Sequence, residues 1–278
     1  MTIQTFKEVI RERRVFSFLC LAIGISWGCQ KVISIDLTAT EKKYVIEASL
    51  SDKDDSIKVI VSRTSDMTSS VLFDPVDNAV ITLKKDSLIP VLIKRTGNGK
   101  YTGYIKTEVG VNYSLKVEVD DNTFTGFCKM PHKVPIDTLF VAPSTIFGKP
   151  KNLATVKFAD PPEQDNYYRF LLSTNGFDNS SIFITDDRLF NGRNVKYDLN
   201  DFLVEKNEHY SIDKYDWVYV EARSIDPAIY KYFYSLKEYT IDPDPGNTPE
   251  NPVSNIAGGA LGYFSVHSYQ LLKCVSPY

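Results

Sequence analysis

The stretch NYSLKVEV, Asn112–Val119, decides the fold class of this chain. Every second residue from Tyr113 to Val119 is apolar, and the residues between them are polar or charged. Successive side chains of an extended strand point to opposite faces, so this pattern places all the apolar residues on one face. A half-buried β-strand is therefore expected here, and with it a mainly β protein.

The same period of two appears on both sides of this stretch. SIKVIVSR, Ser56–Arg63, and NAVITLKK, Asn78–Lys85, each alternate in this way. Gly97-Asn98-Gly99 separates two further runs, and such residues favour the tight turn of a β-hairpin. Several short strands at regular spacing predict a small β-sandwich domain over residues 43–131.

A proline-rich segment follows this first group of strands. Pro131 and Pro135 restrict the backbone, so MPHKVPIDTL predicts a stiff linker. A second β-rich domain is then expected over residues 136–278. Its strands are predicted in NYYRFLLSTNG, Asn166–Gly176, and in DWVYVEARSI, Asp216–Ile225.

One segment of the second half changes to a helical period. Asp226 can cap a helix and Pro227 fits its first turn, while Ile229 and Phe233 are four residues apart. We expect a helix over residues 226–239. The predicted fold is thus two β-sandwich-like domains, of the immunoglobulin-like or carboxypeptidase-regulatory-like kind, with one helix in the second.

The N-terminal stretch FLCLAIGISWGCQKV, Phe18–Val32, predicts where the protein resides. Basic residues precede it, and Val15–Trp27 carries no charge but is too short to span a bilayer. This pattern is typical of a secretory signal, and the residues before Cys29 are similar to a bacterial lipobox. We expect a lipoprotein signal peptide over residues 1–28, a lipid on Cys29 and a tether over residues 29–42. Ordinary cleavage and an uncleaved anchor are the alternatives.

Charge and composition exclude one class of partner. The chain of 278 residues has a net charge of −3. Loss of residues 1–28 would remove four basic and two acidic residues, which leaves −5. No basic stripe is present, so nucleic acid is not expected as a partner.

The most promising polar cluster is TDDRLFNG, Thr185–Gly192. Asp186, Asp187, Arg188 and Phe190 combine charge with an aromatic ring in a predicted turn, a mixture suited to a specific contact with a ligand or partner. Two alternatives stay open. The carboxylates could bind calcium, or the loop could be structural, with Asp187 paired to Arg188 and Phe190 as its anchor.

No sequence motif for catalysis is present. The chain has neither HExxH nor GxSxG, although a Ser/His/Asp set can assemble from distant residues. Acidic residues at Asp52, Asp54 and Asp55 are typical of a solvated hairpin tip. No metal site and no cofactor are expected.

Cys128 and Cys274 are the two cysteines that follow Cys29 in the sequence. An exported protein meets oxidising conditions, so a disulfide between them is possible. Two buried thiols are the alternative.

An ordered set of segments resembles one known family. These segments are CQKVISIDL, VDNAVITLKK, GKYTGYIKTEVGVNYSLKVEV, MPHKVPIDTL, FADPPEQDNYYRF, ITDDRLFNG, VEARSIDPAIYKYFYSL and NPVSNIAGGALGYFSVHS. Together they are similar to the Bacteroidota lipoprotein family catalogued as domain of unknown function 4249 (DUF4249). The resemblance implies an exported, lipid-anchored, β-rich protein found alongside TonB-dependent outer-membrane receptors. It implies no catalytic residues.

The expected function follows from the lipid signal and this resemblance. It is a non-catalytic envelope lipoprotein, bound to the outer-membrane bilayer through Cys29, that assists a TonB-dependent receptor in nutrient capture. A structural or adhesive envelope protein is the alternative, and a hydrolase is the third. Gln30–Ile33 lack the acidic export signal that often follows the lipidated cysteine in that group, so the face of the outer membrane stays open.

Overall fold

The computed structural model describes residues 42–65, 73–146, 148–163, 165–176, 180–200, 212–241 and 250–278. Within these ranges the protein is mainly β with a single helix, as the sequence predicts. None of the described helical segments is long and apolar enough to cross a membrane. The predicted signal peptide, Cys29 and most of the tether lie outside the described residues.

The first sheet contains ten strands and folds around the larger of two apolar cores. Its strand order is β15-β8-β7-β4-β5-β6-β2-β1-β16, and β3 pairs with β2. The strands from the first half of the chain are β1 Tyr44–Ser51, β2 Ser56–Arg63, β3 Asp74–Pro75, β4 Val80–Lys85, β5 Val91–Gly97, β6 Lys100–Tyr104, β7 Asn112–Val119 and β8 Asn122–Lys129.

Strand β7 confirms the pattern from which the fold class was predicted. Its apolar residues Tyr113, Leu115, Val117 and Val119 are buried, and the residues between them are partly or fully exposed. β7 pairs with β4 on one side and with β8 on the other, so its inward side chains pack beside those of both neighbouring strands.

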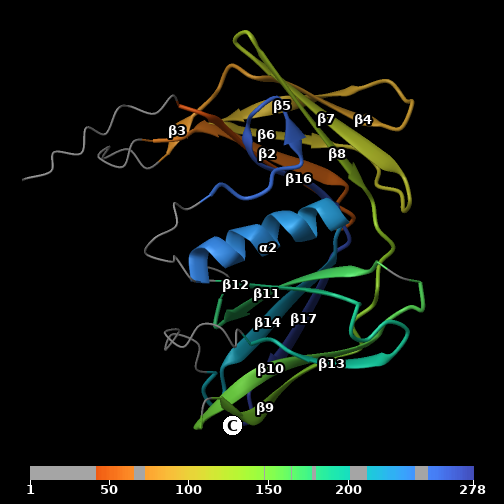
Figure 1. The fold of residues 1–278 in the computed structure, drawn as a ribbon, viewed down its shortest axis with the longest axis vertical. Helices are drawn as coiled ribbons and strands as arrows, with labels where there is room; N and C mark the ends of the chain where they lie inside the picture. The colour runs from red at the N-terminus through yellow and green to blue at the C-terminus, as the bar shows by residue number, and fades with distance from the viewer. Residues whose placement is uncertain are drawn as a thin grey trace, which may run out of the picture. The chain divides into compact units, whose positions relative to one another are not determined.

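Two strands from the end of the chain complete this first sheet. β16, Leu261–His267, pairs in parallel with β1, and β15, Ile256–Ala257, pairs with β8. In Figure 1 the blue β16 lies among the orange and yellow strands of the first half. Strand pairing therefore crosses the predicted boundary between residues 43–131 and 136–278, and residues 41–278 pack as one compact unit. Separate folding of residues 43–131 and 136–278 remains a prediction.

A second, smaller sandwich surrounds the other core. Its three-stranded sheet has the order β13-β10-β9 and its four-stranded sheet the order β12-β11-β14-β17. The core between them includes Phe158, Tyr168 and Phe170, each at most 1% exposed. The bounds are β9 Thr138–Ile146, β10 Lys149–Ala159, β11 Tyr167–Thr174, β12 Ser181–Asp186, β13 Asn194–Asp198, β14 Trp217–Ser224 and β17 Gln270–Val275.

Helix α2, Pro227–Ile241, confirms the predicted helix. The Asp226 carboxylate accepts a hydrogen bond of 2.9 Å from the Ala228 backbone, as an N-cap residue does. The helix contacts β11, β12 and β16 (Figure 1). Ile229 and Phe233 are buried in the core of the first sheet, so α2 belongs to that core although it follows the second group of strands.

The predicted linker is held to the strands beside it. The backbone nitrogen of Val134 donates to Ser224 Oγ at 3.1 Å, and that of Ile136 donates to Gln270 Oε1 at 2.9 Å. Both Val134 and Ile136 are buried in the second core. The segment after Pro131 is thus part of the second sandwich rather than a free spacer.

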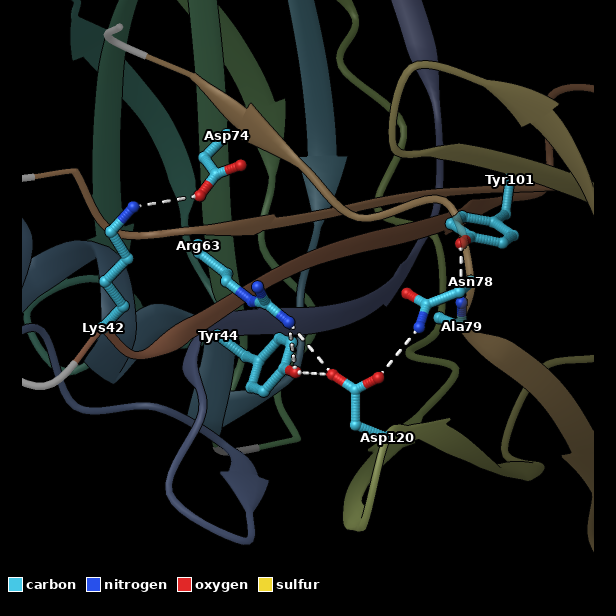
Figure 2. A network of polar contacts seen from close by, with 8 residues as sticks. All are labelled: Lys42, Tyr44, Arg63, Asp74, Asn78, Ala79, Tyr101 and Asp120. Carbon is cyan, nitrogen blue, oxygen red and sulfur yellow. Dashed lines mark hydrogen bonds and ion pairs between the residues drawn. The ribbon is translucent and has the colours of Figure 1, made fainter.

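A polar network closes one end of the first sheet (Figure 2). Asp120, in the turn between β7 and β8, accepts hydrogen bonds from the Tyr44 hydroxyl at 2.6 Å, Arg63 Nη2 at 3.0 Å and Asn78 Nδ2 at 2.9 Å. The bond from Tyr44, followed by the others, lowers the pKa of Asp120. Since the donors come from β1, β2 and the loop before β4, the network joins four segments, and we assign it a structural role.

Candidate functional site

The last residue of β12 and the loop after it contain the four residues that the sequence singled out. Two of them are structural. The Asp187 carboxylate, which is 3% exposed, accepts a hydrogen bond of 3.1 Å from the Asn166 backbone. The Phe190 ring packs on Phe158 and Tyr168, with centroids 6.0 and 6.3 Å apart. Phe190 therefore anchors the loop, as the structural alternative proposed.

The other two residues form an ion pair at the surface. Arg188 Nε lies 2.9 and 3.0 Å from the two carboxylate oxygens of Asp186, and Nη2 lies 2.9 Å from Oδ2. The expected pairing of Asp187 with Arg188 is therefore wrong. Successive side chains at the end of a strand point to opposite faces, so Asp187 turns inward while Asp186 and Arg188 share the outer side.

Helix α2 supplies aromatic residues that face this ion pair. The Tyr230 ring lies 5.1 Å from the Tyr167 ring and 5.8 Å from the Tyr234 ring, measured between centroids. Asp186, Arg188 and Tyr230 line two adjoining hollows, which together form a surface groove between α2 and the loop after β12. The groove is completed by Tyr167, Ile184, Thr185, Leu189, Pro227, Lys231 and Tyr234.

Electrostatics keep the groove in one protonation state near neutral pH. Burial by itself would raise the pKa of Asp186, but hydrogen bonds from Arg188 and Tyr230 outweigh it and the pKa is lowered. Burial, followed by the hydrogen bond to Asp186, raises the pKa of Tyr230 to about 12. The groove thus presents an ionised carboxylate paired with a guanidinium and a neutral phenol, which are fixed charge and hydrogen-bonding groups.

The groove also presents a large exposed apolar side chain. Leu189 is 88% exposed and Tyr234 is 45% exposed, while the Arg188 side chain is 78% exposed. Tyrosine, arginine and an exposed leucine side by side make a surface on which another molecule can be desolvated and oriented.

Sequence reasoning found the loop but missed the helix wall of this groove. Tyr230 and Tyr234 are four residues apart, so they share one face of α2. This spacing was a signal available in the sequence. It could not show that the face lies beside a loop about forty residues earlier in the chain, because that contact depends on how the helix docks.

One serine–histidine pair does assemble in the structure. Ser265 Oγ lies 3.1 Å from His267 Nδ1 in β16, but each residue is 1% exposed. The charged groups that act on the ring are Arg223 and Arg169, not a carboxylate. A nucleophile must reach its substrate, so this buried pair lacks the access that nucleophilic catalysis requires.

The acidic clusters are occupied by internal contacts. Asp54 accepts hydrogen bonds from Ser56, Asp55 from Thr107 and Asp52 from the Tyr269 backbone. Within the described part of the chain, no three His, Cys, Asp or Glu side chains are grouped as metal ligands.

Both remaining cysteines are free thiols. Cys128 lies in β8 within the first core, where its sulfur accepts a hydrogen bond of 3.1 Å from the Val266 backbone. Cys274 lies in β17 against the second core. The possible disulfide is therefore not formed, because the two strands face different cores.

Comparison with solved structures found remote similarity. A chain from a cytokine receptor complex has 7% sequence identity and a TM-score of 0.27, over 84% of this chain and 96% of that one. The FN1-FN3 domains of chicken CNTN1 have 7% identity and a TM-score of 0.26, over 85% and 67% of the two chains. A comparison with curated proteins found no match.

Comparison with family models gave one match that spans most of the sequence. The model described as domain of unknown function (DUF4249) matches residues 30–271. The ordered segments that suggested this family all lie inside or directly beside the matched range. The chain belongs to the DUF4249 family.

Proposed function

We propose that this chain is a non-catalytic binding protein, held on the outer membrane by a lipid on Cys29, that assists a TonB-dependent receptor in nutrient capture. The observation that carries the binding role is the groove of Tyr230, Tyr234, Arg188 and Leu189. The membrane location rests on the N-terminal signal, and the receptor rests on the family resemblance.

The composition of the groove favours a protein as the partner. Tyrosine and arginine are the residues that most often carry binding energy at protein interfaces, because they combine large contact area with hydrogen bonding. Here two tyrosines flank a guanidinium that Asp186 already orients through three contacts of 2.9–3.0 Å. Such a preoriented group loses little further conformational freedom when a partner binds.

Capture of the receptor from detergent-solubilised outer membranes tests this proposal. Leu189→Ala with Tyr234→Ala removes two exposed groove side chains and leaves both members of the Asp186–Arg188 pair in place. We expect recovery of the receptor to fall at least tenfold, which corresponds to loss of about 1.4 kcal/mol of binding free energy. Mass spectrometry of the captured proteins is the measurement.

A matched pair on another surface provides the control. Leu271 and Tyr278 are 43% and 50% exposed, so Leu271→Ala with Tyr278→Ala removes the same chemical groups elsewhere. This control should recover the receptor as the parent protein does. Equal recovery with the groove variant would reject the groove as the contact, and absence of any receptor from the parent capture would favour a structural or adhesive role.

The membrane part of the proposal has its own test. We expect Cys29→Ala to move the protein from the membrane fraction to the soluble fraction, since several acyl chains are needed to hold a globular domain on a bilayer. Fractionation with mass spectrometry of the N-terminal peptide measures this. An unmodified Cys29 in the membrane-bound parent protein would contradict it.

A further inference from the structure

The hairpin between β4 and β5 exposes an unbroken apolar run. Its residues Leu88, Ile89, Pro90, Val91 and Leu92 are all exposed, and Ile89 reaches 88%. Leu88 and Leu92 are each 59% exposed. Turns between strands ordinarily carry polar residues. A run of exposed apolar residues this long is unfavourable in water unless a partner molecule or a membrane covers it.

The strand register shows which residues share the outer face of the sheet with this run. Ile81 and Leu83 of β4 and Ile93 of β5 are buried, so Leu92 and its cross-strand neighbour Thr82 face outward. Phe127 of β8 is 66% exposed. It is the cross-strand partner of Ser114 in β7, and Ser114 is the cross-strand partner of Lys84 in β4. Phe127 therefore lies on the same face as the hairpin.

Basic side chains flank the apolar run. Lys84 precedes it and Lys94 follows it, and alternation places both on the outer face with Leu92. Among the described residues neither lysine has an ion-pair partner, whereas Lys85 is paired with Glu108 at 2.8 Å. The acidic residue of the hairpin, Asp86, accepts a hydrogen bond of 3.2 Å from the Asn112 backbone.

We propose that this hairpin inserts into the interfacial region of a lipid bilayer that carries anionic headgroups. Leu88 and Ile89 at the tip would enter the acyl boundary, while Lys84 and Lys94, with Leu92 between them along the hairpin, would remain at the headgroup phosphates. Phe127 would lie at the same interface. This contact is distinct from the groove beside α2 and from the lipid expected on Cys29.

Charge and composition favour a bilayer over a protein as the occupant. Protein interfaces are enriched in tyrosine, tryptophan and arginine and depleted in lysine, and leucine is rare among their energetic hot spots. The hairpin has the reverse composition, with aliphatic residues at the tip and lysines on the strands that lead into and out of it. That arrangement is typical of segments that lie in a membrane interface, where the positive charges meet anionic lipid.

A depth measurement on the full chain tests the proposal. Ile89→Trp places a fluorophore at the tip, and the chain is reconstituted into phosphatidylcholine vesicles with or without about one-third phosphatidylglycerol, where part of the lipid has brominated acyl chains. The signal of the parent protein, which keeps Trp217 after loss of residues 1–28, is subtracted. We expect bromine to quench the added tryptophan at least twofold in the anionic vesicles and less in the neutral ones.

Two controls make the result specific. Asp121→Trp places the fluorophore in the exposed turn between β7 and β8, at the opposite end of the same sheet, and should show no quenching. Lys84→Glu with Lys94→Glu, combined with Ile89→Trp, should abolish the difference between vesicle types. The same reversal at Lys149 and Lys157, which are exposed on β10, should leave it unchanged.

Two outcomes would overturn the proposal. Quenching of Ile89→Trp no greater than that of Asp121→Trp would show that the hairpin stays in water. Protection of the fluorophore only after a purified receptor is added would show that a protein, not lipid, covers this face. Neither outcome depends on the groove, so the proposed function can fail or survive independently.

Discussion

A single added methyl group at Gly262 is expected to destabilise the protein by about 4 kcal/mol or more. Gly262 lies in β16 with φ of +97°, a conformation that residues with a side chain rarely adopt. A Cβ built there would lie 2.1 Å from the backbone oxygen of Ile46 and 2.8 Å from its carbonyl carbon. Ile46 is its register partner in β1, so neither strand can move without breaking the parallel pairing.

Gly259→Ala is the matched control for Gly262→Ala. Its φ is +90°, so alanine is strained there as well, but no atom lies within 4 Å of the added Cβ. Backbone strain of this kind costs about 1–3 kcal/mol, which should be the whole effect at residue 259. Urea unfolding of both variants measures the difference. Equal destabilisation would mean that β16 does not approach β1 as closely as the structure places it.

Acidification below about pH 6.5 is expected to weaken the fold through His267, with a slope that rises to about 1.4 kcal/mol per pH unit once the unfolded histidine is fully protonated. His267 is 1% exposed, and burial, followed by Arg223 and Arg169, holds its pKa well below 6.5. Below pH 6.5, His267 of the unfolded chain therefore binds a proton, whereas His267 of the folded chain stays neutral. Stability is present above the unfolded pKa of about 6.5 and is lost as the pH falls toward the folded pKa.

His267→Gln isolates this contribution, because glutamine is polar and stays neutral throughout the range. Urea unfolding of both proteins at pH 7.5, 6.5 and 5.5 measures the free energy of unfolding. The parent should lose about 1 kcal/mol more than the variant between pH 6.5 and 5.5, because the unfolded histidine is only half protonated at the start of this interval. The carboxylates contribute equally to both proteins and cancel in the difference. Parallel curves for the two proteins would contradict a neutral, buried His267.

The location of these two residues explains why both effects are large. Gly262 and His267 belong to β16, which joins the end of the chain to its first strand. Phe264 of the same strand is fully buried, and its Cβ lies 3.0 Å from the position of a Cβ built on Gly126. Close packing on both sides leaves no room for relaxation, so changes in β16 act on the whole first core.

The candidate site was partly predictable. Charge and an aromatic ring in TDDRLFNG indicated a specific loop, and Asp186 and Arg188 do line the groove. The sequence could not separate them from Asp187 and Phe190, because the direction of each side chain depends on where β12 ends. It also could not place Tyr230 in the same groove, since that contact comes from the docking of α2 against β12.

The sequence by itself determined the secondary structure and the family. Alternation in Asn112–Val119 predicted a strand with one buried face, and Asp226-Pro227 predicted where the helix begins, because both are local effects of backbone geometry. Only the tertiary structure decided which strand pairs with which. Alternation tells which face of a strand is buried but carries no information on its neighbour, so nothing local could show that β16 pairs with β1 some two hundred residues away.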